Sequence, residues 1–226
     1  MRAAVLSLVV LTVFTASPVY AAADKAARDE RLSALYDAEW ERALRENPLR
    51  ASYLGDHRFD DRWPDLSSTA LAASHAADLQ VLRTLEAISP DSLADGDRLD
   101  RELFRRMYQG DVDAYAWGLQ YLPVTQRSGV QTAHEIAELL PFATVRDFEN
   151  WIARLEGVGR YVDETIALMR EGKRRGLVQP RIIMERVPDQ IAKQVVTDAD
   201  GSPYFAPFRT MPPGIPAAEQ ERLRTE

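Results

Sequence analysis

The sequence predicts a mainly α-helical protein, built as an irregular multi-helix array. Apolar residues recur at spacings of three and four along most of the chain, the pattern of helices with one buried face. Proline, glycine and short polar clusters separate these segments. Strand-like patterns are nearly absent, and residues 181–184 form the one short β-like run. With 46% hydrophobic and 28% charged residues, the composition is typical of a folded globular chain and not of a disordered one.

Residues 1–21 are predicted to be a signal peptide. Arg2 supplies a positive charge, residues 3–16 form an apolar run, and Val19-Tyr20-Ala21 resembles a peptidase cleavage site. An uncleaved anchor is the alternative, but this run is shorter than the roughly 20 apolar residues that span a bilayer. We therefore expect residues 22–226 to be a periplasmic or secreted helical region, with no membrane span after signal cleavage.

Three helices are expected in the first half of the mature chain. Residues 31–46 carry apolar side chains at helical spacing until Pro48 ends the run. A second helix should start at a serine cap, Ser67 or Ser68, and continue to about residue 88. A third should open near Asp95 and continue toward residue 121, although two internal glycines weaken it. Its core candidates are Leu99, Leu103, Phe104, Met107, Tyr108 and Tyr115.

The second half predicts further helices. Thr144 stands three residues before Asp147, the spacing of a capping box, and should start a helix over residues 144–155. Another helix is expected over residues 161–172. Pro180 suits the first turn of a helix toward residue 196, with a kink at Pro188. Residues 198–216 carry five prolines and should be extended or turn-like, and a last helix should cover residues 216–225.

Composition excludes several function classes. The chain has no cysteine, which rules out disulfides, thiol nucleophiles and Cys-ligated metals. Its formal net charge of −7 makes nucleic acid an unsuitable partner. Neither a Gly-x-Ser-x-Gly motif nor a phosphate-binding glycine loop is present. The one dense basic run, residues 172–176, follows a predicted helix, where positive charge favours the helix dipole.

Asp56, His57 and Arg58 are the candidate binding residues. With Asp60 and Asp61 they gather oxygen ligands and one imidazole in a loop, but the spacing is not that of a Ca²⁺ loop. The alternative is that an aspartate caps a turn while the arginines pair with neighbouring carboxylates. We favour this alternative, and we expect Phe59 and Trp63 to be buried so that the loop is ordered.

His134-Glu135 is the nearest approach to a zinc-peptidase motif. Such motifs place a second histidine one helical turn after the first, and this position is Glu138. We interpret residues 134–140 as a short amphipathic helix, and we assign no catalytic residue and no metal ligand in this chain.

A series of motifs resembles the bacterial family called domain of unknown function 885. In chain order they are YLGDHRFDDRWPDLS (residues 53–67), LDRELF (99–104), LPVTQ (122–126), GVQT (129–132), FENWIARL (148–155), YVDETIALMREG (161–172) and SPYFAPF (202–208). The resemblance implies a longer, exported, mostly helical protein of the zinc-metallopeptidase or related hydrolase type. It also implies a His-Glu-x-x-Pro-Gly-His zinc motif in the C-terminal half, which this sequence does not contain.

Two functions remain open. The first is the N-terminal half of a larger helical metallopeptidase-like fold, inactive alone, with zinc expected only in full-length relatives and a C-terminal half as partner. The second is a non-catalytic secreted helical module that binds a partner chain or peptide. The first predicts exposed apolar residues that a partner would cover. The candidates are Ile182, Ile183, Met184, Ile191 and Val195.

Overall fold

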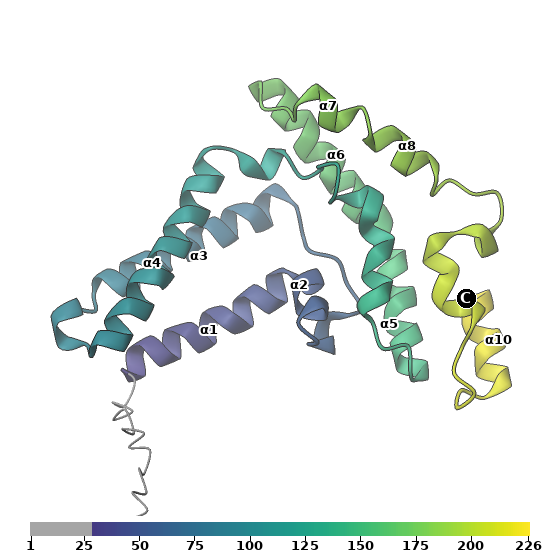
Figure 1. Cartoon of the computed structure of the whole chain (residues 1–226), viewed down its shortest axis with the longest axis horizontal. Coiled ribbons are helices and arrows are strands. Elements are labelled where there is room, and N and C mark those ends of the chain that lie inside the picture. The colour runs from purple at the N-terminus through teal and green to yellow at the C-terminus, as the bar shows by residue number, and fades with distance from the viewer. Residues whose placement is uncertain (1–28) are drawn as a thin grey trace, which may run out of the picture.

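The computed structural model describes residues 29–226, which form helices joined by loops (Figure 1). The predicted signal peptide lies outside the described residues. Within the described range no strand is present, so the prediction of a mainly α fold is confirmed. None of the helices in that range is both long and apolar enough to cross a membrane.

The α-helices are α1 Glu30–Glu46, α2 Pro48–Tyr53, α3 Ser68–Glu86, α4 Asp95–Ala116, α5 Val145–Glu156, α6 Val158–Arg175, α7 Arg181–Met184, α8 Val187–Ala192, α9 Ala206–Arg209 and α10 Ala217–Thr225. Short 3-10 helices lie between them: η1 His57–Phe59, η2 Pro90–Ser92, η3 Leu119–Tyr121, η4 Val130–Leu139, η5 Ala199–Gly201 and η6 Pro203–Phe205.

The first core lies where α1, α3 and α4 meet. Its buried members are Leu32, Val81, Leu85, Ile88, Leu93 and Tyr108. Polar contacts fix the register of these helices: Arg42 of α1 donates to Asp78 of α3 at 2.6 Å, and Tyr108 of α4 donates to Glu39 of α1 at 2.8 Å. The carbonyl of Leu85, in the last turn of α3, accepts a hydrogen bond from the buried guanidinium of Arg101 at 2.7 Å.

The second core joins α5 to the C-terminal segments. Its buried members are Leu140, Phe148, Trp151, Phe208, Met211, Ile215 and Leu223. The indole N–H of Trp151 donates to the carbonyl of Tyr204 at 3.0 Å, which holds η6 against α5. The predicted capping box is present, since Thr144 accepts from the Asp147 amide and Asp147 accepts from the Thr144 amide.

Several expectations about local structure were wrong. The β-like run at residues 181–184 is helix α7. The single helix expected from Pro180 divides into α7 and α8, because Pro188 cannot donate to the i−4 carbonyl and disfavours continuation through it. Residues 198–216 contain η5, η6 and α9, and the short helix expected at residues 134–140 is the longer 3-10 helix η4.

The expected core of α4 was half wrong. Tyr108 is buried and Phe104 and Tyr115 are half-buried, but Leu99, Leu103 and Met107 are exposed. The physical reason is that α4 carries apolar residues on two faces, and only one of them packs against α1 and α3.

Candidate functional site

The candidate loop Asp56-His57-Arg58 forms surface ion pairs. Asp56 caps η1 by accepting from the Arg58 amide at 3.1 Å. The Arg58 guanidinium binds Asp56 at 2.6 Å and Glu41 of α1 at 2.8 Å. Its hydrogen bond to Arg58 lowers the pKa of the Asp56 carboxyl. The sequence favoured a turn capped by an aspartate, with arginines paired to neighbouring carboxylates, and Asp56 and Arg58 make these contacts.

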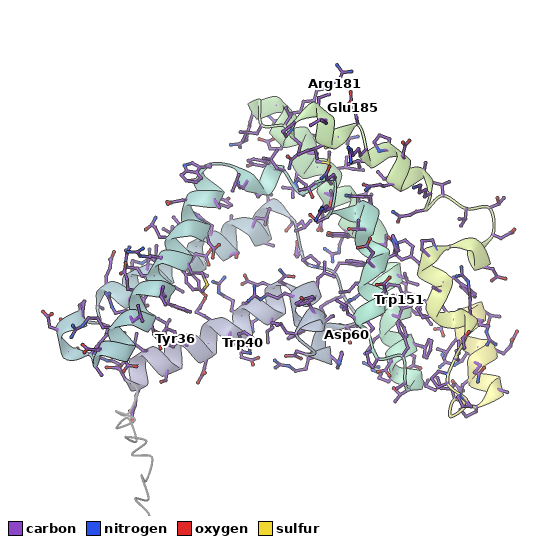
Figure 2. The ribbon with its side chains drawn as sticks, viewed as in Figure 1. Tyr36, Trp40, Asp60, Trp151, Arg181 and Glu185 are labelled. Carbon is purple, nitrogen blue, oxygen red and sulfur yellow. The ribbon has the colours of Figure 1, made fainter. Side chains whose placement is uncertain are left out.

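His57 points its ring toward a buried carboxylate. Its Nδ1 lies 2.7 Å from Oδ2 of Asp60, and the hydroxyl of Ser52 donates to Oδ1 of Asp60 at 2.5 Å. Asp60 and Ser52 are both buried between α2 and α5, where Figure 2 labels Asp60. Asp60 is therefore the member of the loop that reaches the interior.

Arg154 of α5 completes this buried group and is fully enclosed, with 0% of its surface exposed. Its Nη2 donates to the Phe59 carbonyl at 2.9 Å and to Ser52 Oγ at 3.1 Å, and lies 3.8 Å from Asp60 Oδ1. Its Nε and Nη1 have no hydrogen-bond partner among the described residues. Burial lowers the pKa of Arg154 to about 10, against the opposing charges of Asp60 and Asp61.

Trp63, in the loop, packs against Arg154 of this buried group. As expected it is buried, and its indole N–H donates to the Arg154 carbonyl at 2.6 Å. Its ring stacks on Tyr161 of α6, with centroids 4.8 Å apart, and lies 5.7 Å from the Arg154 guanidinium carbon. Phe59, also expected to be buried, is only half-buried, because its ring lies at the surface beside the guanidinium carbons of Arg58 and Arg62, at 5.2 and 5.7 Å. We call Ser52, Asp60, Trp63 and Arg154 the buried junction, because they join α2 to α5.

Sequence reasoning missed Arg154. The signal that could have found it is its position on α5, three residues after Trp151 and six after Phe148, on the apolar face of that helix. An arginine on such a face requires a buried carboxylate partner, and Asp60 is in the loop that also holds Trp63. These contacts hold α2 and the loop against α5 and so stabilise the fold.

His134 and Glu135 lie on η4 beside a polar cavity of about 470 Å³. Its other lining residues are Gln131, Thr132, Gln190, Lys193, Gln194, Gly201, Pro203 and Arg209. The His134 ring meets the edge of Tyr204, with centroids 5.8 Å apart. His57 belongs to the loop and His75 stacks on Tyr115, so the three histidines lie in three different places. Within residues 29–226 no three His, Cys, Asp or Glu side chains gather in a metal-binding group, and these donors do not fit a zinc ion.

An apolar groove of about 350 Å³ lies along α6. Its lining residues are Tyr121, Leu122, Pro123, Val124, Ile166, Met169, Arg170, Lys173, Leu177, Val178, Gln179 and Met184. We call it the α6 groove. The sequence did not predict it, because residues 121–124, α6 and α7 are separated along the chain.

Gly172 allows the walls of the α6 groove to approach the helix. A Cβ atom at this position would lie 2.7 Å from the Leu177 carbonyl oxygen and 2.9 Å from that of Tyr121. Gly176 ends α6 with a φ of 76°, a left-handed conformation that suits glycine, and turns the chain back toward the groove. Two glycines of the basic run thus shape the groove.

The predicted exposed apolar residues lie on the segment that borders this groove. Ile182, Ile191 and Val195 are exposed as expected. Ile183 and Met184 are half-buried, and Met184 lines the groove. Figure 2 shows Arg181 of α7 and Glu185, which follows this helix, at the outer edge of the molecule, where they form an ion pair of 2.6 Å. Exposed apolar residues are therefore found beside the groove on α7, and also on and after α8.

The comparisons with known proteins agree with the resemblance seen in the sequence. The model of the family described as "Bacterial protein of unknown function (DUF885)" matches residues 48–226. This range contains α2 through α10, including the buried junction and the α6 groove. A comparison with curated proteins gave no match. Because the match covers well over half of the sequence, the chain belongs to the DUF885 family of bacterial proteins.

Proposed function

We propose that this chain is the N-terminal helical part of an exported, zinc-peptidase-like hydrolase and that its own contribution is docking. The family resemblance suggests that the zinc motif of longer relatives lies in a C-terminal half. The observation that carries the docking role is the α6 groove together with the exposed apolar residues beside it. On this proposal the chain alone is inactive, and the groove receives an apolar segment of the metal-bearing half.

The chemistry of the groove supports this assignment. Most of its lining is built from aliphatic, methionine and tyrosine side chains, among them the exposed Val178, and the exposed Ile182 of α7 adds apolar surface outside the lining. Large contiguous apolar surfaces are uncommon on soluble monomers and mark interaction sites. Arg170 and Lys173 stand at the rim, and neither has an ion-pair partner among the described residues, whereas Arg174 and Arg175 are paired with Glu171. The groove therefore suits an apolar segment with acidic residues at its edge.

The test is the affinity of the purified chain for a family-type C-terminal half, measured by calorimetry. Ile166→Lys places a charge on the exposed part of the groove and should weaken binding at least tenfold, which corresponds to about 1.4 kcal/mol. Lys173→Glu should also weaken it by repelling the acidic edge. The matched control is Leu54→Lys, an exposed leucine outside the groove, which should bind as the parent does. Equal affinity of all four proteins, or no binding at all, would refute the docking role.

The second candidate is a non-catalytic secreted module that binds a free peptide. The observation that favours it is the size of the groove, since about 350 Å³ accommodates a few apolar side chains of a short ligand. This function would be favoured if an acidic amphipathic peptide binds the chain in the absence of any C-terminal half, and if Ile166→Lys abolishes this binding.

A further inference from the structure

A second apolar surface lies on the exposed face of α4 and on Trp117, the residue that follows this helix. Leu99, Leu103, Met107 and Trp117 are 60%, 56%, 52% and 70% exposed. With Gly96, Gly110 and Ala114 they lie within an arc of about 80° at the helical 100° per residue. These seven residues form the α4 seam. In Figure 1, α4 lies at one end of the molecule, beside α1 and α3.

Among the described residues, nothing packs closely on the two glycines of the seam. A Cβ added at Gly96 or Gly110 would meet no atom within 4 Å, and neither residue has a positive φ. Glycine inside a helix is destabilising relative to alanine, so a packing reason is expected for it. Close approach of another helix to the seam supplies one.

We propose that the α4 seam packs antiparallel against the α4 seam of a second copy of this chain. Six of the seam residues form three pairs, and the two members of each pair are equally far from a point between Arg106 and Met107. In that register Trp117 faces Gly96 of the other copy, and Leu99 faces Ala114. Leu103 faces Gly110, and Met107 lies beside the two-fold axis. A large side chain meets a small one at each of these three pairs, and Met107 is placed near Met107 and Arg106 of the second copy; a two-fold interface requires such isologous complementarity.

The dimer should be weak and insensitive to salt. A helix of 22 residues is about 33 Å long, and one helix pair of this length lies at the low end of specific interfaces. The seven seam residues include no ionisable group, and the neighbouring Arg106 is already paired with Glu102 at 2.9 Å. We expect dissociation on the order of micromolar, with little change between low and high salt.

Cysteine cross-linking tests the register, since the sequence contains no native cysteine. Met107→Cys should form a disulfide-linked dimer by itself. Leu99→Cys alone and Ala114→Cys alone should not, because equivalent positions would lie about 22 Å apart along the seam. A mixture of these two variants should cross-link as a heterodimer. Monomer at every concentration in sedimentation, or strong cross-linking of Leu99→Cys alone as in a parallel pair, would overturn the proposal.

Two substitutions separate dimerisation from folding. Gly110→Leu removes the space that receives Leu103, and it should abolish the dimer without lowering the melting temperature, because leucine favours the helix and nothing lies near its Cβ. Leu103→Glu should do the same, whereas the exposed control Leu54→Glu should dimerise as the parent does. A Gly110→Leu protein that dimerises with unchanged affinity would contradict the seam.

Discussion

At the scale of single residues, the buried junction is where the chain is most sensitive to substitution. Arg154 is fully enclosed and its charge is compensated by Asp60 at 3.8 Å, which itself accepts from Ser52 and contacts His57. Removing one member of a buried ion pair leaves the other charge desolvated without a partner. A substitution at either member should therefore lower the free energy of unfolding.

Asp60→Asn should lower the free energy of unfolding by about 3 kcal/mol, because the buried Arg154 then loses its nearest opposite charge. Asp95→Asn is the matched control. Asp95 is exposed and pairs with the exposed Arg98 at 3.5 Å, and the loss of such a surface pair should cost less than about 1 kcal/mol. Urea unfolding of both variants measures the difference. Equal effects would mean that Asp60 does not compensate Arg154.

Two half-buried tyrosines should make the stability of the fold decrease at alkaline pH. Burial, with a smaller contribution from Tyr161, raises the pKa of Tyr204 to about 12, and burial raises the pKa of Tyr161. Above pH 10 the unfolded chain releases these phenolic protons before the folded chain does. Stability should therefore fall as the pH rises from 10 to 12. Tyr204→Phe should show a shallower fall in thermal melts over this range, and an unchanged slope would count against the burial of the hydroxyl.

At the scale of elements, periodicity predicted where helices lie better than which face each one buries. The capped start of α5 and the extent of α1 and α3 follow from local rules that the residues themselves obey. The exposed face of α4 could not be predicted, because its two apolar faces are equivalent in the sequence and the tertiary contacts decide between them. Arg154 was missed for a related reason: its partner Asp60 is distant in the sequence and close only in the fold.

Two helical glycines should respond oppositely to alanine. Gly110→Ala should raise the free energy of unfolding by about 1 kcal/mol at concentrations where the chain is monomeric, since its Cβ meets nothing and alanine favours the helix. Gly172→Ala should lower it by about 1–3 kcal/mol, because a Cβ would collide with the carbonyls of Leu177 and Tyr121. Thermal melts of both variants provide the check, and stabilisation by both would contradict the close packing around α6.

At the scale of the whole molecule, two cores are connected by the buried junction, and two apolar surfaces face outward. The first core lies among α1, α3 and α4, and the second lies between α5 and the C-terminal segments. The α6 groove and the α4 seam lie on different elements, so the docking of another half and the pairing of two copies can be tested independently.

Export should be visible in the mature N-terminus. The short apolar run of residues 3–16 and the pattern at residues 19–21 predict cleavage that leaves Ala22 first. N-terminal sequencing of the protein secreted by a bacterial host measures this, and an intact Met1 on membrane-bound material would contradict it.

The purified chain should hold no stoichiometric zinc after dialysis and should hydrolyse no peptide. The donor groups of the described residues do not converge, and His57, His75 and His134 lie apart. Elemental analysis with a calorimetric zinc titration is the measurement. One tightly bound zinc ion that is lost in His134→Ala would show that η4 holds a metal site.

Hydrogen–deuterium exchange of the chain with and without a family-type C-terminal half tests the docking role most directly. If the half covers the α6 groove, exchange should slow in peptides that contain residues 121–124 and 166–184, while the peptides of α1 and α3 stay unchanged. Ile166→Lys should remove this protection and the exposed control Leu54→Lys should keep it. Unchanged exchange along the groove at saturating partner, or protection confined to α1 and α3, would contradict the account.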